Sequence, residues 1–337
     1  MYQFFVRRIL WMGLVMVMVS IITFLLMHQV PGGPFDREKA LPERIQKNLE
    51  KKYHLDDPLL KQYLDYMYYA FIPRVTTGEW KPLPENDHLI NLKLPIGDNA
   101  YIRWMNFGPS IKSASRTVND IFRDNFPVSA KLGGAAVAIA CLIGMPLGTL
   151  AAIRKNTIFD YLGMGIAVLG VSLPIVTLGP LLRYIVGVEL GLLPPTGWGT
   201  LEQMIMPSFT LGFASSALIA RLTRASLLQV LDEDYIRTAR AKGLREQLVI
   251  TRHAMKNAMI PVVTVLGPLI AALITGTFVT EIVFGIPGMG KYFVTSIGGR
   301  DYPVIMGTIL IYAFFLVFAN FIVDIVYAWL DPRIRLS

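Results

Sequence analysis

Long apolar stretches separated by short polar segments dominate this chain. Six of them come close to or exceed the length of about 20 residues that a helix needs to cross the hydrocarbon core of a bilayer. The six stretches are Ile9–Val30, Ala130–Ile153, Tyr161–Val188, Met204–Leu222, Ala258–Ile282 and Val304–Leu330. The first follows two arginines, as in a signal peptide, but it is too long for one and is expected to remain as an anchor. The pattern predicts an all-α polytopic membrane protein with six transmembrane helices.

Composition supports the membrane interpretation. Hydrophobic residues make up 53% of the 337 residues and charged residues 17%, against about 25% charged in typical soluble domains. The single cysteine, Cys141, excludes a disulfide scaffold within the chain. The net charge of +8 would suit nucleic acid if it formed a patch. Here the charges flank apolar stretches instead, so the lipid bilayer is the expected partner and nucleic acid is not.

Lysine and arginine gather in the short loops on one side of the predicted helices. These loops carry Arg7, Arg8, Arg154, Lys155, Arg224, Arg237, Arg240, Lys242, Arg245, Arg252 and Lys256, and the C-terminal tail carries Arg333 and Arg335. The Gly191–Gln203 loop on the other side has none. Because cytoplasmic loops hold the excess of positive charge, both termini are expected in the cytoplasm.

This orientation divides the chain at its membrane boundaries. Residues 1–30 form the N-terminus and first helix, 31–127 a large external segment, 128–330 helices two to six, and 331–337 a cytoplasmic tail. Within the external segment, residues 72–105 are rich in proline and indicate an insertion built of loops. Leu89–Leu94 predicts a short strand there, in a small hairpin.

The external segment also contains two helical patterns. Leu41–Tyr53 predicts one helix with Pro42 at its first position, and Asp56-Asp57-Pro58 starts the second. Apolar side chains recur on the second at helical spacing, at Leu59, Leu60, Tyr63, Leu64, Met67 and Tyr68. We expect this stripe to pack on the membrane surface or on the helix bundle; binding a partner is the alternative.

Three charged residues, Arg183, Glu281 and Asp324, stand within or at the ends of the apolar stretches. Such residues are candidates for functional sites. Counted at about 1.5 Å per residue along continuous helices, they lie about 34, 36 and 31 Å from the far ends of their helices. That distance takes them across a core about 30 Å thick. We therefore expect them to snorkel or pair at the boundary, with gating or substrate contact as the alternative.

The most informative polar segment is Asp232–Lys256 on the cytoplasmic side. Asp232 or Asp234 can cap a short helix that Gly243 ends, and a second helix follows from about Arg245. Two short helices joined at a glycine can carry force from a soluble motor into the membrane helices.

Tyr235–Leu244 (YIRTARAKGL), followed by Arg252–Asn257 (RHAMKN) and Pro261, resembles the coupling loop of ABC importer permeases. The general pattern E-A-A-x3-G-x9-I-x-L-P has Arg237, Thr238 and Ala239 at its first three positions here, keeps Gly243, and has His253, Met255 and Lys256 at the last three. This variant is typical of the B-type subunit in the dipeptide/oligopeptide (nickel) permease group. Similar stretches cover nearly the whole chain, namely Ala40–Asp57, Asn106–Ser110, Phe126–Leu132, Leu193–Gly197, Glu281–Gly290 and Leu330–Arg335. The segment Pro73–Trp104 looks longer than in typical members.

The resemblance implies a type I ABC importer permease (MetI-like) fold with a large external loop after helix 1. It implies a non-catalytic subunit that forms half of a pore with a second homologous permease. Two cytoplasmic ATPases would bind ATP and Mg²⁺, and an external solute-binding protein would deliver di- or oligopeptides. Nickel, glutathione or another small solute is the alternative cargo. The residues expected to contact an ATPase are Tyr235, Ile236, Ala239, Arg240, Lys242, Gly243 and Leu244, and those of a possible outer gate are Glu281, Gly285, Pro287, Gly288 and Gly290.

No cofactor or metal is expected on this chain itself. Gly285–Lys291 fits G-x4-G-K, but Tyr292 stands where a phosphate-binding loop needs Ser or Thr, and no buried strand precedes it. The four histidines have neither the helical spacing nor the cysteine and acidic neighbours of a zinc site. Two other classes stay open at this point, a secondary carrier or channel and a membrane scaffold without transport.

Overall fold

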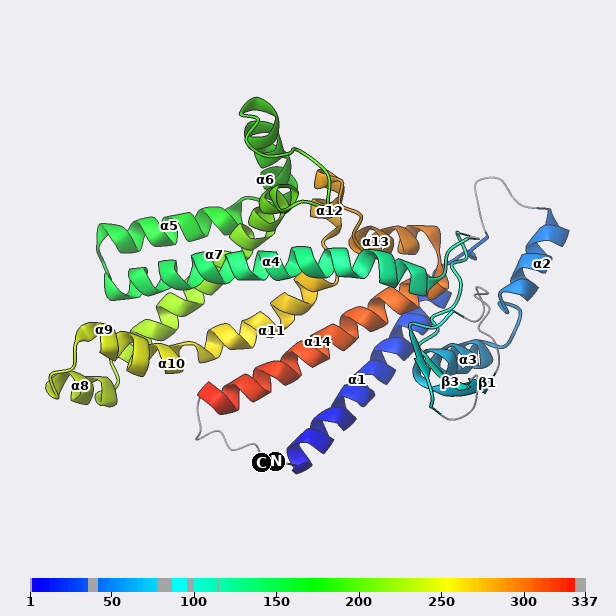
Figure 1. Ribbon diagram of the computed structural model, residues 1–337, viewed down its shortest axis with the longest axis horizontal. Helices are drawn as coiled ribbons and strands as arrows, with labels where there is room; N and C mark the ends of the chain where they lie inside the picture. Colours follow the sequence, from blue (N-terminus) through cyan, green and yellow to red (C-terminus); the bar gives the residue numbers. More distant parts are fainter. Residues whose placement is uncertain (1, 36–41, 78–86, 96–99, 114, 331–337) are drawn as a thin grey trace. The chain divides into compact units, whose positions relative to one another are not determined.

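The computed structural model describes residues 2–35, 42–77, 87–95, 100–113 and 115–330 (Figure 1). The chain divides into two units. One comprises residues 1–13, 128–290 and 314–337, and the other residues 14–127 and 291–313. The predicted cytoplasmic tail, 331–337, lies outside the described residues, as does part of the predicted insertion.

Helices long and apolar enough to cross a membrane account for most of the fold. Four are continuous, α1 (Tyr2–Gln29), α4 (Val118–Ile153), α7 (Leu201–Leu231) and α14 (Tyr302–Leu330). Within the described ranges, two bent helix pairs bring the number of candidate spans to six. The predicted helical membrane fold is therefore confirmed, with four continuous candidate spans, and the count reaches the predicted six if each bent pair is one span.

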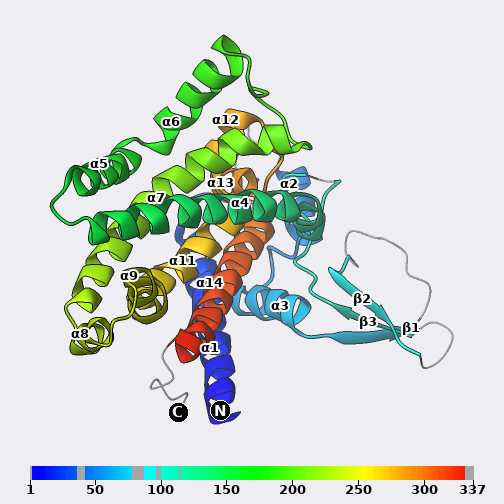
Figure 2. The same cartoon turned by 60° about the vertical axis from the view of Figure 1, so that its left-hand side comes forward.

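The third predicted span is not one straight helix. It consists of α5 (Ile158–Ser172) and α6 (Ile175–Leu182), which continues as a π-helical turn, Arg183–Glu189; the two halves meet at 100° (Figure 2). Pro174 stands at the break, where its missing N–H and fixed φ favour the start of a new helix. The distance counted for Arg183 along a straight helix is therefore wrong. Its guanidinium donates a hydrogen bond to the carbonyl oxygen of Val283, at 3.0 Å.

The fifth predicted span ends earlier than its hydropathy indicates. Helices α9 (Glu246–Leu248) and α10 (Met255–Ala258), with the π-helical turn Val249–Ala254 between them, precede α11 (Ile260–Ile274) at a bend of 54°. Gly276, with φ +119°, then turns the chain into two separate helices, α12 (Phe278–Phe284) and α13 (Gly290–Gly299). Glu281 thus lies on α12, and the distance counted for it along a helix reaching Ile282 is also wrong.

In the first unit, α4, α5 and α7 lie against one another through small residues (Figure 1). A Cβ added at Gly148 of α4 would stand 2.4 Å from the carbonyl oxygen of Ala220 on α7, and one at Gly144 2.7 Å from that of Ser216. A Cβ at Gly170 of α5 would stand 3.0 Å from the carbonyl oxygen of Phe213. Close backbone approach of this kind provides much of the packing between membrane helices.

The second unit contains two short helices, α2 (Glu43–Lys52) and α3 (Leu59–Phe71), and a small sheet. Strands β1 (Arg74–Thr77), β2 (Ile90–Lys93) and β3 (Ala100–Trp104) pair in the antiparallel order β1-β3-β2 (Figure 2). The strand predicted over Leu89–Leu94 is confirmed as β2. Pro42 precedes α2 as its N-cap instead of forming its first turn.

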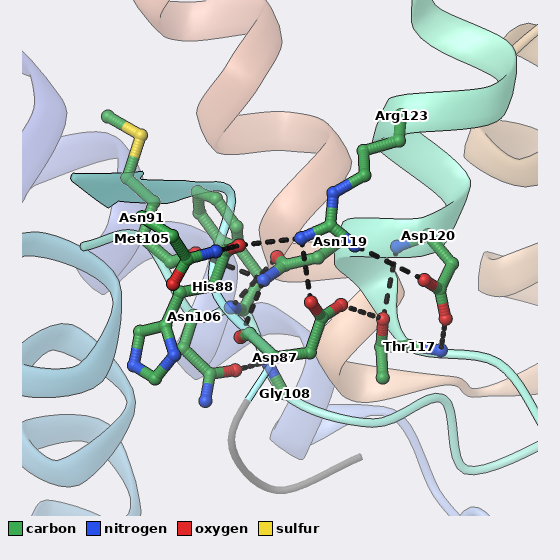
Figure 3. Close-up of polar contacts among 11 residues, drawn as sticks. Asp87, His88, Asn91, Met105, Asn106, Gly108, Thr117, Asn119, Asp120 and Arg123 are labelled. Carbon is green, nitrogen blue, oxygen red and sulfur yellow. Dashed lines mark hydrogen bonds and ion pairs between the residues drawn. The ribbon is translucent and has the colours of Figure 1, made fainter. Parts of the chain in front are cut away.

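A buried carboxylate joins this sheet region to the first turns of α4 (Figure 3). Asp87 accepts hydrogen bonds from Thr117 Oγ1 at 2.6 Å and from the guanidinium of Arg123 at 2.7 Å. The same arginine donates to the carbonyl oxygen of His88, and Asn119 donates to those of Asp87 and Met105. Side chains of α4 thereby satisfy backbone groups just before β2 and just after β3, which holds these two strands against the start of α4.

Candidate functional site

Helix α8 (Asp234–Ala241) is the first of the two short helices predicted in the Asp232–Lys256 segment. Ile236 and Ala239 form its apolar face and are buried. They pack in a cluster with Ala152, Leu227, Val249, Ala254 and Ala258. This face anchors α8 to α7 and to the segment that leads into α11, so a displacement of α8 must move those helices with it.

Gly243 ends α8 through a Schellman motif. The N–H of Gly243 bonds to the carbonyl of Arg240 at 2.9 Å, and that of Leu244 to the carbonyl of Ala239 at 3.4 Å. Gly243 has φ +76°, in the left-handed region that favours glycine. The predicted end of the helix is thus confirmed. At its start, Glu233 occupies the N-cap position and no side chain caps the helix, so neither Asp232 nor Asp234 has the predicted capping role.

The opposite face of α8 is exposed and basic. Tyr235 is exposed, and its hydroxyl accepts a hydrogen bond from Asn257 Nδ2 at 2.8 Å. Arg240 forms a two-point ion pair with Glu246, with contacts of 2.7 and 3.2 Å, and this pairing raises the pKa of Arg240. Lys242, Gly243 and Leu244 are exposed beyond the helix end. The structure therefore separates the seven predicted contact residues into a buried pair, Ile236 and Ala239, and five that are open to a partner.

The predicted outer-gate residues converge on Glu281, which is 1% exposed. Its carboxylate accepts hydrogen bonds from Ser129 Oγ of α4 at 2.7 Å and from the backbone N–H groups of Thr277 at 3.2 Å and Gly290 at 2.8 Å. Ser129 Oγ in turn accepts the N–H of Met289. Glu281 is thus held inside the protein by hydrogen-bond donors, instead of snorkelling at a membrane boundary.

Glycines make room for this carboxylate. A Cβ added at Gly288 would stand 2.3 Å from Cδ of Glu281, and one at Gly290 would stand 2.8 Å from Oε2. Gly285 ends α12 with φ +67°, and the adjacent carbonyl of Phe284 accepts the N–H of Gly197. Four of the five predicted gate residues therefore shape one turn around the fifth, and Pro287 is exposed at its tip.

An ion pair between the buried Asp160 and the partly buried Arg224 joins α5 to α7 at the ends nearest to α8. Arg224 donates from Nε to Asp160 Oδ1 at 2.6 Å and from Nη2 to Oδ2 at 2.8 Å. Asp160 lies in the first turn of α5 and also accepts the N–H of Asn156. Among the described residues, no group of three His, Cys, Asp or Glu side chains is placed so that it could hold a metal ion.

Comparison with known proteins identifies the family. Residues 144–336 match the family described as "Binding-protein-dependent transport system inner membrane component", and residues 1–82 match the N-terminal family of such membrane components. The chain belongs to this family. The inner membrane component assignment agrees with the six candidate spans and with the predicted multi-pass membrane location.

Two relatives of this inner membrane component match over their full length. The "Dipeptide transport system permease protein DppB" of Bacillus subtilis is 44% identical over 336 residues, covering 100% of this chain and 99% of the relative. The "Oligopeptide transport system permease protein OppB" of Salmonella typhimurium is 40% identical over 337 residues, covering 99% and 100%. An inward-facing structure of the MetNI methionine ABC transporter matches with a TM-score of 0.50 and 17% identity, over 63% of this chain and 96% of that chain. This match confirms the predicted MetI-like fold.

The sequence analysis did not identify two residues that bind buried carboxylates. Ser129 is the hydrogen-bond partner of Glu281, and Arg224 is the ion-pair partner of Asp160. Arg224 was assigned only to the positive charge that sets orientation. Asp160, an acid at the start of an apolar stretch, was a signal that a cation had to lie nearby.

Replacing Asp160 by Asn is expected to destabilise the first unit, because the partly buried Arg224 loses the carboxylate that compensates its charge. Since Arg224 keeps some contact with solvent, we expect a loss of about 1–3 kcal/mol in the free energy of unfolding. The melting temperature of the purified complex would report it. Asp234→Asn removes the exposed ion pair with Arg237 and serves as the control, with a loss below about 1 kcal/mol. Equal melting temperatures for the two variants would contradict a stabilising role for the Asp160–Arg224 pair.

Proposed function

We propose that this chain forms half of the translocation pore of an ATP-driven importer for di- or oligopeptides. The full-length match to two peptide transport permeases, at 40–44% identity, carries this proposal. Helix α8 supports it independently, because its exposed face is basic and its opposite face, with Ile236 and Ala239, is packed against the rest of the chain.

The proposed partners follow from the importer architecture. A second homologous permease completes the pore, and an external solute-binding protein delivers the peptide. Two cytoplasmic ATPases bind ATP and Mg²⁺ and hydrolyse ATP. In this arrangement both termini and the coupling segment 232–256 lie in the cytoplasm and residues 31–127 lie outside, with the permease core over 128–330.

The exposed face of α8 is the proposed ATPase contact. Tyr235, Arg240, Lys242 and Leu244 offer an aromatic ring, two cations and an apolar side chain to a groove on the ATPase. Ile236 and Ala239 pass the resulting displacement inward, because their buried face joins α8 to α7 and to the segment before α11. Gly243 ends α8 in a turn that keeps Leu244 beside the exposed face of the helix.

The turn around Glu281 is the proposed outer gate. Gly288 and Gly290 let the backbone of this turn approach the Glu281 carboxylate closely, and the buried carboxylate ties this backbone to Ser129 on α4. A movement of α4 would therefore be transmitted to the turn through hydrogen bonds.

The decisive experiment purifies the tagged chain from its native membrane in mild detergent and identifies the proteins that accompany it. Two P-loop ATPases and a second permease are expected. Reconstituted in liposomes, the complex should hydrolyse ATP faster when the binding protein carries a peptide, and should accumulate labelled di- or tripeptides in preference to Ni²⁺ or glutathione. Uptake by this chain alone, driven by an ion gradient without ATP, would refute the proposal in favour of a secondary carrier.

A further inference from the structure

Helix α3 exposes an apolar edge that nothing in the described part of the chain covers. Leu60, Leu64 and Tyr68 follow one another at intervals of four residues and are 70%, 55% and 47% exposed. Lys61 and Asp65 directly follow Leu60 and Leu64 in the sequence and are also exposed. Because they too are four residues apart, they form a polar edge beside the apolar one. The helix therefore has a packed side and, facing outward, one apolar and one polar edge.

The packed side of α3 shows how far along the membrane helices it lies. The hydroxyl of Tyr63 is 2.8 Å from Ser20 Oγ on α1, and its ring packs edge-on against Phe24. Ser20 precedes Gln29, the last residue of α1, by nine residues, a distance of about 14 Å along the helix, and Phe24 lies about 8 Å from that end.

Helix α14 gives a second, independent measure. The hydroxyl of Tyr66 lies 3.5 Å from the carbonyl oxygen of Pro303. A Cβ added at Gly307 would stand 3.6 Å from the same hydroxyl. Gly307 is five residues past the start of α14 at Tyr302, about 8 Å along the helix. Pro303 is one residue past the start of α14, about 2 Å along the helix. The contacts with both helices thus place α3 about 2–14 Å inward from their ends, and not beyond those ends.

This position indicates that lipid covers the exposed apolar edge of α3. The hydrocarbon core is about 30 Å thick, whereas α1 and α14, with 28 and 29 residues, are about 42–44 Å long. Helices centred on the core extend about 6–7 Å beyond it at each end, so contacts about 2–14 Å inside those ends lie between the headgroups and the outer acyl chains of one leaflet. At the same level α1 exposes Ile22, Leu25 and Leu26, so the membrane helix beside α3 also presents apolar side chains to lipid at this depth. The guanidinium of Arg74 stacks on the rings of Tyr68 and Tyr69, at 4.6 and 3.9 Å, a combination suited to the boundary between acyl chains and headgroups.

We propose that α3 is a membrane-embedded interfacial helix, with Leu60, Leu64 and Tyr68 among the acyl chains and Lys61 and Asp65 toward the headgroups. An amphipathic helix that lies in the plane of a leaflet has this distribution of side chains. The inference does not depend on which solute the importer carries or on which side of the membrane residues 31–127 lie.

Spin labels on opposite edges of α3 test this proposal. In a Cys141→Ala background, Leu60→Cys and Leu64→Cys place a nitroxide on the apolar edge, and Lys61→Cys and Asp65→Cys are the matched controls. The complete complex is reconstituted in phosphatidylcholine–phosphatidylglycerol vesicles, and collision rates are measured with O₂, which concentrates in lipid, and with a water-soluble nickel chelate. Equal assembly and ATPase activity of all four variants show that the label leaves the fold intact.

The ratio of O₂ to nickel-chelate collisions is expected to be several-fold higher at positions 60 and 64 than at 61 and 65. Equal ratios at all four positions, with strong collisions from the nickel chelate, would place α3 in water and overturn the proposal. Protection of positions 60 and 64 from both reagents would also overturn it, because another protein subunit would then cover this face.

Discussion

Replacing Glu281 by alanine is expected to destabilise the turn between α12 and α13 and to abolish uptake. The change removes the acceptor for Ser129 Oγ and for the N–H groups of Thr277 and Gly290, all in a buried site. Each buried donor left without a partner costs about 1–3 kcal/mol, and the vacated volume adds to that cost. Because losses within one hydrogen-bond network are not additive, we expect a total of about 3–5 kcal/mol, measured as a large fall in the melting temperature of the purified complex.

Three control variants identify the source of this loss. Ile282→Ala changes a neighbouring side chain that is 57% exposed and should have little effect in detergent. Glu281→Gln keeps the size and one acceptor oxygen, so its loss should be intermediate. Gly288→Ala brings a Cβ to 2.3 Å from Cδ of Glu281 and should be as damaging as removing the carboxylate. A normal melting temperature and normal uptake for Glu281→Ala would refute the assigned role of this site.

The importance of Ser129 for this site was beyond the reach of sequence reasoning. The glycine-rich stretch after Glu281 indicated a turn, and the turn is present. Ser129, however, lies 152 positions away in the sequence and looks like any small polar residue at the start of an apolar stretch. Only the packing of α4 against α12 brings the hydroxyl to the carboxylate, and hydropathy carries no information on that packing.

Hydropathy predicted where the membrane-spanning segments lie along the chain, but not the direction of the chain within them or the end of the fifth. Counting apolar residues measures the length that a helix could reach, and it gives the same count whether or not the helix bends. Pro174 and Gly276 mark two of the breaks, yet proline and glycine are common in unbroken membrane helices. Their effect depends on whether neighbouring helices satisfy the freed backbone groups, which is a tertiary property.

The short helix predicted at α8 is present, but the sequence did not determine which of its predicted contact residues pack inward. Ile236 and Ala239 lie three residues apart and therefore share one face of the helix. An apolar face can dock on a partner or on its own chain, and the sequence alone does not distinguish the two. The buried cluster with Leu227 and Val249 shows that this face belongs to the chain itself.

Gly243→Val is expected to uncouple ATP hydrolysis from uptake. A Cβ at this position would meet nothing within 4 Å, so the cost comes from φ +76° and not from a clash. The left-handed conformation costs an ordinary residue about 1–2 kcal/mol, and β-branched side chains tolerate it least. Relief of that strain would displace Leu244 and the end of α8 from their present positions. Because 1–2 kcal/mol corresponds to a population change of about 5- to 30-fold, we expect uptake per ATP hydrolysed in proteoliposomes to fall by a similar factor.

A graded series at this position separates torsional strain from steric exclusion at the ATPase contact. Asparagine is larger than alanine but adopts the left-handed conformation more readily. If strain at Gly243 controls coupling, uptake per ATP should decrease in the order glycine, asparagine, alanine, valine. If the ATPase instead packs against the bare Cα of Gly243, asparagine should be more damaging than alanine. Normal coupling in Gly243→Val would exclude both explanations and would move the ATPase contact away from this end of α8.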